Sequence, residues 1–189
     1  GASLRVGGSS HFDAGTGDVN LPNVPNLFAG PVTLQAHDVH LAASNGLILG
    51  ASTVSGTFDV TAATGNLTQV GALNVTGAVT LTASQGDVLL EQANAFAAPV
   101  MLNAVNASIH STTALTFGAS TLSGDLKAMA DQGDITQTGP LAITGKTELT
   151  TLAGNVTLTD AANHFGGVVD AQTRGTLSLT STGPLTMGK

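Results

Sequence analysis

Short alternations of apolar and polar residues recur along the whole chain, separated by glycine, asparagine and serine. Val39/Leu41, Leu73/Val75 and Val79/Leu81 are typical, since each pair of aliphatic residues encloses one polar residue. A period of two is typical of a β-strand that buries one face. Thr, Val and Gly favour helices poorly, and no helical stripe persists. The pattern therefore predicts an all-β protein built of many short strands.

Sequence landmarks repeat at a long period. Asn-x-Phe occurs at 26–28, 94–96 and 163–165, and Gly-Ala-Ser-Thr occurs at 50–53 and 118–121. Both patterns return after about 68–69 residues, which is the signature of a tandem array. The segment 67–77 also echoes 135–145. We interpret residues 1–189 as one domain of tandem superrepeats, at about 17–85, 86–153 and 154–189, preceded by a partial coil at 1–16.

A shorter period lies inside the long one. Segments that open on glycine and an aliphatic residue begin at Gly17, Gly46, Gly65 and Gly86, so one long step precedes two shorter ones. We interpret each superrepeat as three coils of about 20 residues, with three short strands per coil. The long step then carries an insert around 22–28. Such coils bury their apolar faces only by stacking, and parallel crossovers are right-handed. The predicted fold is a right-handed parallel β-helix, a solenoid.

The predicted coils place equivalent residues in columns. One inward column is expected to hold Val19, Leu47, Leu67, Val88, Leu115, Ile135, Val156 and Leu185. The outward column beside it would hold Asn20, Ile48, Thr68, Leu89, Thr116, Thr136, Thr157 and Thr186. Gln69 and Gln137 fall at inward positions. Either the strand ends there in a bulge, which we favour, or a buried amide finds hydrogen-bond partners.

The inserts are expected to project from every third coil, in one row along an edge of the rod. Per-repeat insertions of a solenoid often mark its binding face. Phe28, Phe96 and Phe165 are nevertheless expected to be hydrophobic plugs that fasten the inserts to the rod, because exposed rings in a row would promote association.

Composition excludes several functions. The formal charge is -7, with Lys+Arg 5 against Asp+Glu 12, so the chain cannot neutralise a run of phosphates and nucleic acid is not an expected partner. No apolar stretch is long enough to span a bilayer, so no membrane insertion is expected. The chain has no cysteine, which excludes disulfides and thiolate metal sites.

The carboxylates and histidines are the residues that could carry chemistry. Asp18 and Asp87 are equivalent but three coils apart in the predicted stacking, while Asp38 and Asp59 could approach on neighbouring coils without a cation to hold a sugar acid. His37 and His40 flank Asp38, but their odd spacing directs them to opposite faces of a strand. We therefore predict no catalytic residue, no cofactor or cofactor-binding residue and no metal ligand, and a protein that is not an enzyme.

Three motifs carry a family resemblance: residues 26–32, the block Leu49–Val54 and the block Thr64–Gln69. They resemble repeats of filamentous-haemagglutinin-like proteins, large bacterial exoproteins of the two-partner secretion type. The resemblance implies a secreted or cell-surface location, a dedicated outer-membrane secretion partner, and a host-cell glycan or protein bound by the whole adhesin. Ala98 departs from the pattern where Gly30 stands. We see no secretion domain, signal peptide or receptor-binding tip, so an internal piece of a longer protein is expected.

Two functions from different classes follow. The leading expectation is a non-catalytic shaft that projects a binding region from the cell. The alternative is a binding module that holds a host glycan or protein on the insert loops or on the Thr-rich face. A carbohydrate-active β-helix enzyme is a weaker third candidate.

Overall fold

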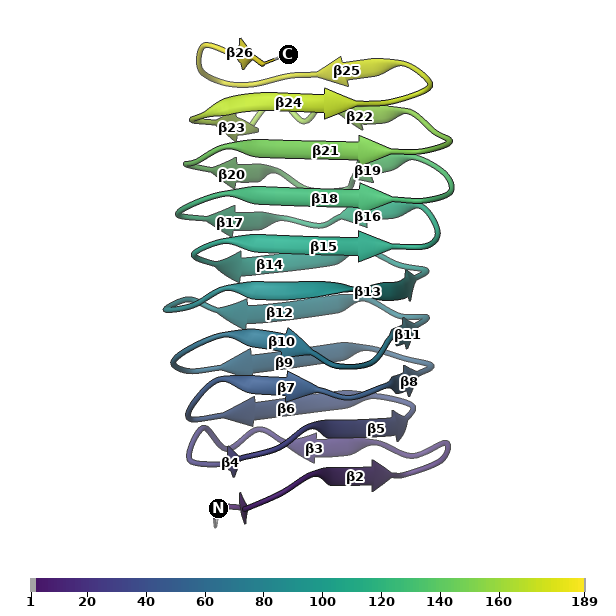
Figure 1. Cartoon of the computed structure of the whole chain (residues 1–189), viewed down its shortest axis with the longest axis vertical. Helices are drawn as coiled ribbons and strands as arrows, with labels where there is room; N and C mark the ends of the chain where they lie inside the picture. The colour runs from purple at the N-terminus through teal and green to yellow at the C-terminus, as the bar shows by residue number, and fades with distance from the viewer. Residues whose placement is uncertain (1–2, 189) are drawn as a thin grey trace.

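The chain forms one rod of stacked coils in the computed structural model, which describes residues 3–188 (Figure 1). The chain rises through the rod from the N-terminus to the C-terminus. The strands nearer the viewer in Figure 1 run from left to right and those behind run from right to left, which is a right-handed winding. All strand pairs in the described part of the chain are parallel. The predicted right-handed parallel β-helix is therefore confirmed.

Two 12-stranded sheets form the opposite walls of the rod. Sheet 1 consists of β2 (Ser10–Asp13), β5 (Val32–Ala36), β7 (Leu47–Leu49), β8 (Ser52–Val54), β10 (Leu67–Gln69), β11 (Leu73–Val75), β13 (Val88–Phe96), β15 (Ala107–Ser111), β18 (Leu126–Ala130), β21 (Thr147–Thr151), β24 (Val168–Gln172) and β26 (Thr186–Met187). Sheet 2 consists of β3 (Val19–Leu21), β6 (Val39–Ala43), β9 (Phe58–Ala62), β12 (Val79–Ala83), β14 (Val100–Ala104), β16 (Leu115–Phe117), β17 (Ser120–Leu122), β19 (Ile135–Gln137), β20 (Leu141–Ile143), β22 (Val156–Leu158), β23 (His164–Phe165) and β25 (Leu177–Leu179). Near the N-terminus, β1 (Arg5–Val6) pairs with β4 (Leu27–Phe28).

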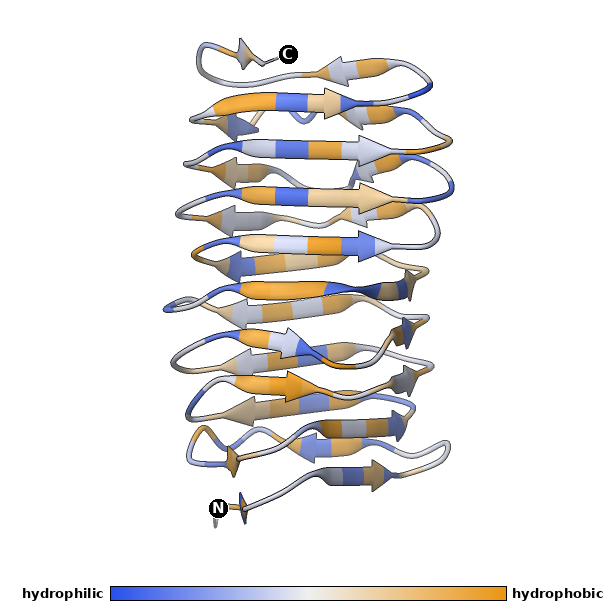
Figure 2. Ribbon diagram, in the orientation of Figure 1, coloured by the Kyte–Doolittle hydropathy of each residue, from blue (hydrophilic) through white to orange (hydrophobic). Residues whose placement is uncertain are grey.

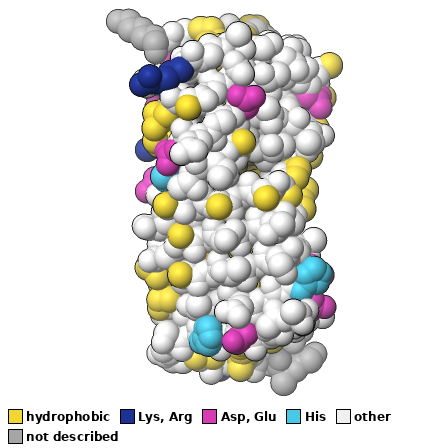
Figure 3. Space-filling model, turned by 90° about the vertical axis from the view of Figure 1, so that its right-hand side faces the viewer, with side chains coloured by type: hydrophobic (Ala, Val, Ile, Leu, Met, Phe, Trp, Pro, Cys, Tyr) yellow, Lys and Arg dark blue, Asp and Glu magenta, His cyan; other side chains and the backbone are white. Residues whose placement is uncertain are grey.

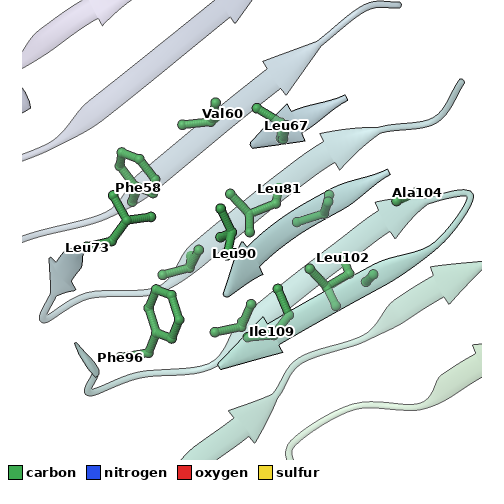
Figure 4. Packing of buried hydrophobic residues seen from close by; sticks show 14 of the residues in the cluster. Phe58, Val60, Leu67, Leu73, Leu81, Leu90, Phe96, Leu102, Ala104 and Ile109 are labelled. Atoms are coloured by element: carbon green, nitrogen blue, oxygen red, sulfur yellow. The ribbon is translucent and has the colours of Figure 1, made fainter. Parts of the chain in front are cut away.

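The core is a single hydrophobic cluster enclosed between the two sheets. Many strands carry both orange and blue or white segments in Figure 2, as one buried face and one outward face require. In Figure 4, Phe58, Leu81 and Leu102 of sheet 2 lie beside Leu73, Leu90 and Ile109 of sheet 1, respectively. These six side chains are at most 3% exposed. The core thus continues from coil to coil instead of closing on itself.

The strand register corrects the predicted superrepeat. Leu47 stacks on Leu67 and Val88 in sheet 1, whereas their counterparts one repeat later, Leu115, Ile135 and Val156, stack on one another in sheet 2. We call the part of a coil that lies in one sheet a half-coil. One repeat therefore contains seven half-coils, which is three and a half coils and not three. Successive half-coils lie alternately in sheet 1 and sheet 2. One repeat starts in sheet 1, and its half-coils begin at residues 32, 39, 47, 58, 67, 79 and 88. The next repeat starts in sheet 2, and its half-coils begin at residues 100, 107, 115, 126, 135, 147 and 156.

An odd number of half-coils explains why the single predicted inward column is wrong. Its members divide between the two walls, with Val19 joining Val39 in sheet 2, and Leu185 is 36% exposed. The segment predicted to be an insert instead ends the half-coil that begins at Val19, where Leu27–Phe28 forms the wall strand β4. The long step is long because it contains three half-coils, beginning at residues 19, 32 and 39. Each repeat consequently enters the rod on the side opposite to the previous one.

Small residues at the corners let successive coils pass closely. Gly65 and its counterpart Gly133 have positive φ, 78° and 95°, a backbone conformation that glycine adopts without steric cost. A Cβ added at Gly86 would lie only 2.1 Å from the carbonyl oxygen of Gly65 on the coil below. Glycine is therefore required at these corners for two separate reasons, backbone conformation and close approach.

Candidate functional site

A buried amide cluster closes the Asn-x-Phe segment of the second repeat. Asn94 is fully buried at the end of its half-coil. Its Oδ1 accepts hydrogen bonds from the Leu73 N–H and from Gln69 Nε2, both at 2.8 Å. Its Nδ2 donates to Gln69 Oε1 at 3.0 Å and to the carbonyl oxygens of Leu90 and His110 at 3.1 and 3.0 Å. One side chain thus links three consecutive coils.

The same cluster recurs on the opposite wall. Asn163 Oδ1 accepts from Leu141 N–H and Gln137 Nε2 at 2.8 Å, and Asn163 Nδ2 donates to Gln137 Oε1 at 2.8 Å. Near the N-terminus, Asn26 Oδ1 likewise accepts from the Leu4 N–H at 2.9 Å. We name the Gln69–Asn94 and Gln137–Asn163 pairs the amide locks.

The amide locks correct the interpretation of the two inward glutamines. The strands do end at Gln69 and Gln137, as the favoured bulge would require. The amide is nevertheless half-buried and fully engaged, since each Nε2 also donates to the carbonyl of Gly71 or Gly139 at 2.7 Å. The alternative, a buried amide with partners, is what the structure shows. Sequence analysis does not identify the paired Asn, although an Asn follows each inward Gln after 25 or 26 residues, which is a usable signal.

The Asn-x-Phe phenylalanines lie inside the rod. Phe28, Phe96 and Phe165 are 3%, 4% and 1% exposed, so they are plugs, as expected. They do not form one row, because Phe96 pairs into sheet 1 beside Val75 whereas Phe165 pairs into sheet 2 beside Ile143.

Asparagine and aspartate side chains stabilise the corners. At the corner leading into sheet 1, Asn66, Asp87, Asn106 and Asp125 each accept a hydrogen bond from a backbone N–H of the next coil, at 2.7 to 3.2 Å. Neutral and charged groups alternate, so no two carboxylates of this ladder are neighbours. At the corner leading into sheet 2, Asn155 N–H donates to Asp134 Oδ1 at 2.7 Å. Asn and Asp side chains thus connect successive coils at both corners.

Ionisable side chains gather on the outer face of sheet 1 in the second half of the rod. Glu148 is in register with Asp170 on the next strand, an arrangement that repels two carboxylates. Lys146 Nζ lies 2.6 Å from an oxygen of each. Its hydrogen bonds to Asp170 and then to Glu148 raise the pKa of Lys146 above its usual value. Lys146 is thus a charged ammonium at neutral pH and not a nucleophile.

The hollows on this face are shallow. One measures about 300 Å³ and lies between Ser108, Lys127 and Lys146, and a neighbouring one of about 240 Å³ lies beside Glu91 and His110. Their polar groups are engaged with one another: Ser108 Oγ donates to Glu91 Oε1 at 2.7 Å, and His110 Nε2 lies 3.0 Å from Asp131 Oδ2.

The other candidate residues either occupy different corners or contact other partners. Asp18 and Asp87 occupy opposite corners, because the strands that follow them, β3 and β13, belong to different sheets. Asp38 Oδ1 accepts from the Thr57 N–H at 2.7 Å, while Asp59 Oδ2 lies 3.6 Å from His40 Nε2. His37 contacts Ser55 Oγ at 3.1 Å. In residues 3–188, no group of three or more His, Cys, Asp or Glu could hold a metal ion.

The predicted Thr-rich column is also divided. Ile48, Thr68 and Leu89 neighbour one another on sheet 1, whereas Thr116 and Thr136 neighbour one another on sheet 2, with hydroxyl oxygens 2.9 Å apart. A single threonine face along the rod is therefore wrong. Figure 3 shows an edge of the rod on which charged side chains are few and most of the surface is uncharged.

No helix within the described residues has the length and apolar character needed to cross a membrane.

Comparison with known proteins agrees with the repeat of seven half-coils. Neither a curated protein nor a solved structure matches the chain. One family model matches residues 1–35, 36–103 and 104–172, and its second and third matches have the length of seven half-coils. Because these matches cover most of its length, the chain belongs to the family described as repeats of unknown function (DUF5649).

Proposed function

We propose that this chain is a shaft segment of a secreted or surface-attached bacterial adhesin, with no catalytic role. The observation that carries the proposal is the continuous core: every coil buries its apolar residues against the coils above and below. Length then increases in proportion to the number of repeats. With strands about 4.8 Å apart, one repeat of three and a half coils adds roughly 17 Å.

Two further features support a load-carrying role. The amide locks join consecutive coils through Asn94 and Asn163, whose side chains are fully buried. The corner ladders add a hydrogen bond at nearly every coil. The resemblance of residues 26–32 to filamentous-haemagglutinin-like repeats supports the rest of the proposal: export through an outer-membrane partner and a distal region that binds a host glycan or protein.

The test asks whether attachment of the intact adhesin to host cells depends on the length of this segment or on its surface residues. Deleting residues 36–172 removes two repeats and should weaken attachment to host cells while secretion continues. Inserting two repeats whose outward residues on both sheets are replaced by Thr and Ser should restore attachment, because a shaft requires length and not surface chemistry. If only the native surface restores attachment, or if the purified chain 1–189 binds host cells by itself, the segment is a binding module instead.

A further inference from the structure

Four asparagines of the chain head the pattern Asn-x-Ser/Thr: Asn66, Asn74, Asn106 and Asn155. This pattern is the acceptor signature for sugar attachment to an asparagine amide. The pattern alone is weak evidence, because it recurs by chance in a chain rich in threonine. The fold, however, separates the four asparagines sharply.

Three of the four serve the corners. Asn66 Oδ1 accepts from the Asp87 N–H at 2.9 Å, and the amides of Asn106 and Asn155 donate to neighbouring aspartates at 2.8 and 3.1 Å. Their counterparts one repeat away are aspartates: Asp134 for Asn66, Asp38 for Asn106 and Asp87 for Asn155. What the corner requires is a side-chain oxygen, so these asparagines have a structural role.

Asn74 does not serve a corner. It lies in β11, at the right of Figure 1, and its exposed carboxamide makes no hydrogen bond to any residue between 3 and 188. Its repeat counterparts are Arg5, which faces Leu27 as Asn74 faces Ala95, and Ala142, which faces His164. The fold therefore does not need an asparagine at this position.

The surroundings of Asn74 suit a bulky substituent. Thr76 is exposed two residues later, and a period of two puts both side chains on the same face. Asn74 borders an open hollow of about 260 Å³ whose other lining residues include Ala95, Ala97, Thr113 and Ala114. The hollow lies just below the volume range of sites for drug-sized ligands, which suits a single sugar ring.

We propose that Asn74 is a glycosylation site that carries one monosaccharide in the folded protein. The donor is a nucleotide-activated sugar. Asn74 Nδ2 forms a bond to the anomeric carbon, the bond from that carbon to the diphosphate oxygen breaks, the nucleoside diphosphate leaves, and the amide proton passes to a base of the transferase. This modification is independent of whether the rod serves as a shaft.

Peptide mass spectrometry of the chain isolated from the cells that make it tests the proposal. The peptide with Asn74 should carry one monosaccharide, and the peptides with Asn66, Asn106 and Asn155 should be unmodified. Asn74→Gln and Thr76→Ala should abolish the adduct, Thr76→Ser should retain it, and Asn103→Gln, at an exposed asparagine outside the pattern, should not affect it.

Because Asn74 is exposed, Asn74→Gln should leave thermal unfolding unchanged, which separates a lost acceptor from a misfolded chain. An unmodified Asn74 overturns the proposal. So does modification spread equally over all four asparagines, or an adduct that survives Thr76→Ala.

Discussion

Replacing Asn94 with alanine removes the centre of one amide lock. The change leaves the buried Leu73 N–H without its acceptor, and the carbonyl oxygens of Leu90 and His110 without this donor. A buried polar group that loses its partner costs about 1–3 kcal/mol. With at least two such groups, we expect a loss of about 4 kcal/mol in the free energy of unfolding. For a chain of this size that is a fall in Tm of roughly 8–16 °C.

Calorimetry measures the fall in Tm, and hydrogen exchange locates it. Because each coil contacts only its neighbours, protection should be lost first at the Leu73 amide and the adjacent coils. Asn103→Ala is the matched control, since Asn103 is exposed and such surface changes stay within about 0.5 kcal/mol. Gln69→Ala in the Asn94→Ala background should cost less than Gln69→Ala alone, because the pair is coupled. If Asn94→Ala shifts Tm no more than Asn103→Ala, the lock does not hold the coils together.

Three further changes test other parts of the rod. Phe96→Ala should lower stability by about 3–5 kcal/mol in chemical denaturation, as deletion of a packed ring does, and an unchanged midpoint would refute the plug. Gly86→Ala should destabilise by about 1–3 kcal/mol because its Cβ meets the Gly65 carbonyl, whereas Gly7→Ala, with open space around it, should not. Hydrogen bonds from the Thr57 N–H and hydroxyl lower the pKa of Asp38. The ionised Asp38 carboxylate therefore stabilises the fold above about pH 3.9, and this contribution is lost as pH falls further. Asp38→Asn retains the acceptor oxygen but does not titrate, so Tm should depend less on pH in the acid range when melts are recorded over a pH series. An unchanged dependence of Tm on pH would contradict the assignment.

Much of the fold could be predicted because the inward or outward direction of a side chain in a strand is a local property. Whether Leu73 or Val75 points inward depends only on the period of two, and both are buried. The side of the rod on which a strand lies is not local. The long step from Gly17 to Gly46 fits one coil with an insert as well as one and a half coils, and both arrangements bury the same residues. Only the pairing partner distinguishes them, and that partner is set by long-range contacts.

The amide locks show the same limit at the level of one residue. Gln69 was noticed as a polar residue at an inward position, but its partner Asn94 is 25 residues away. Local sequence indicates that an inward amide needs a partner, without saying which residue supplies it. For Lys146, likewise, sequence places Glu148 nearby, while only the register brings Asp170 to the same ammonium.

The odd half-coil count has a consequence for how such proteins can change length. Recombination between the tandem repeats within such a gene would add or remove whole repeats. Gain of one copy turns everything beyond it by half a revolution about the long axis, so a distal domain would face the opposite direction. Gain of a pair restores the original direction and adds roughly 34 Å at the usual strand spacing. Where a distal domain must face one way, lineages should therefore differ by even numbers of copies.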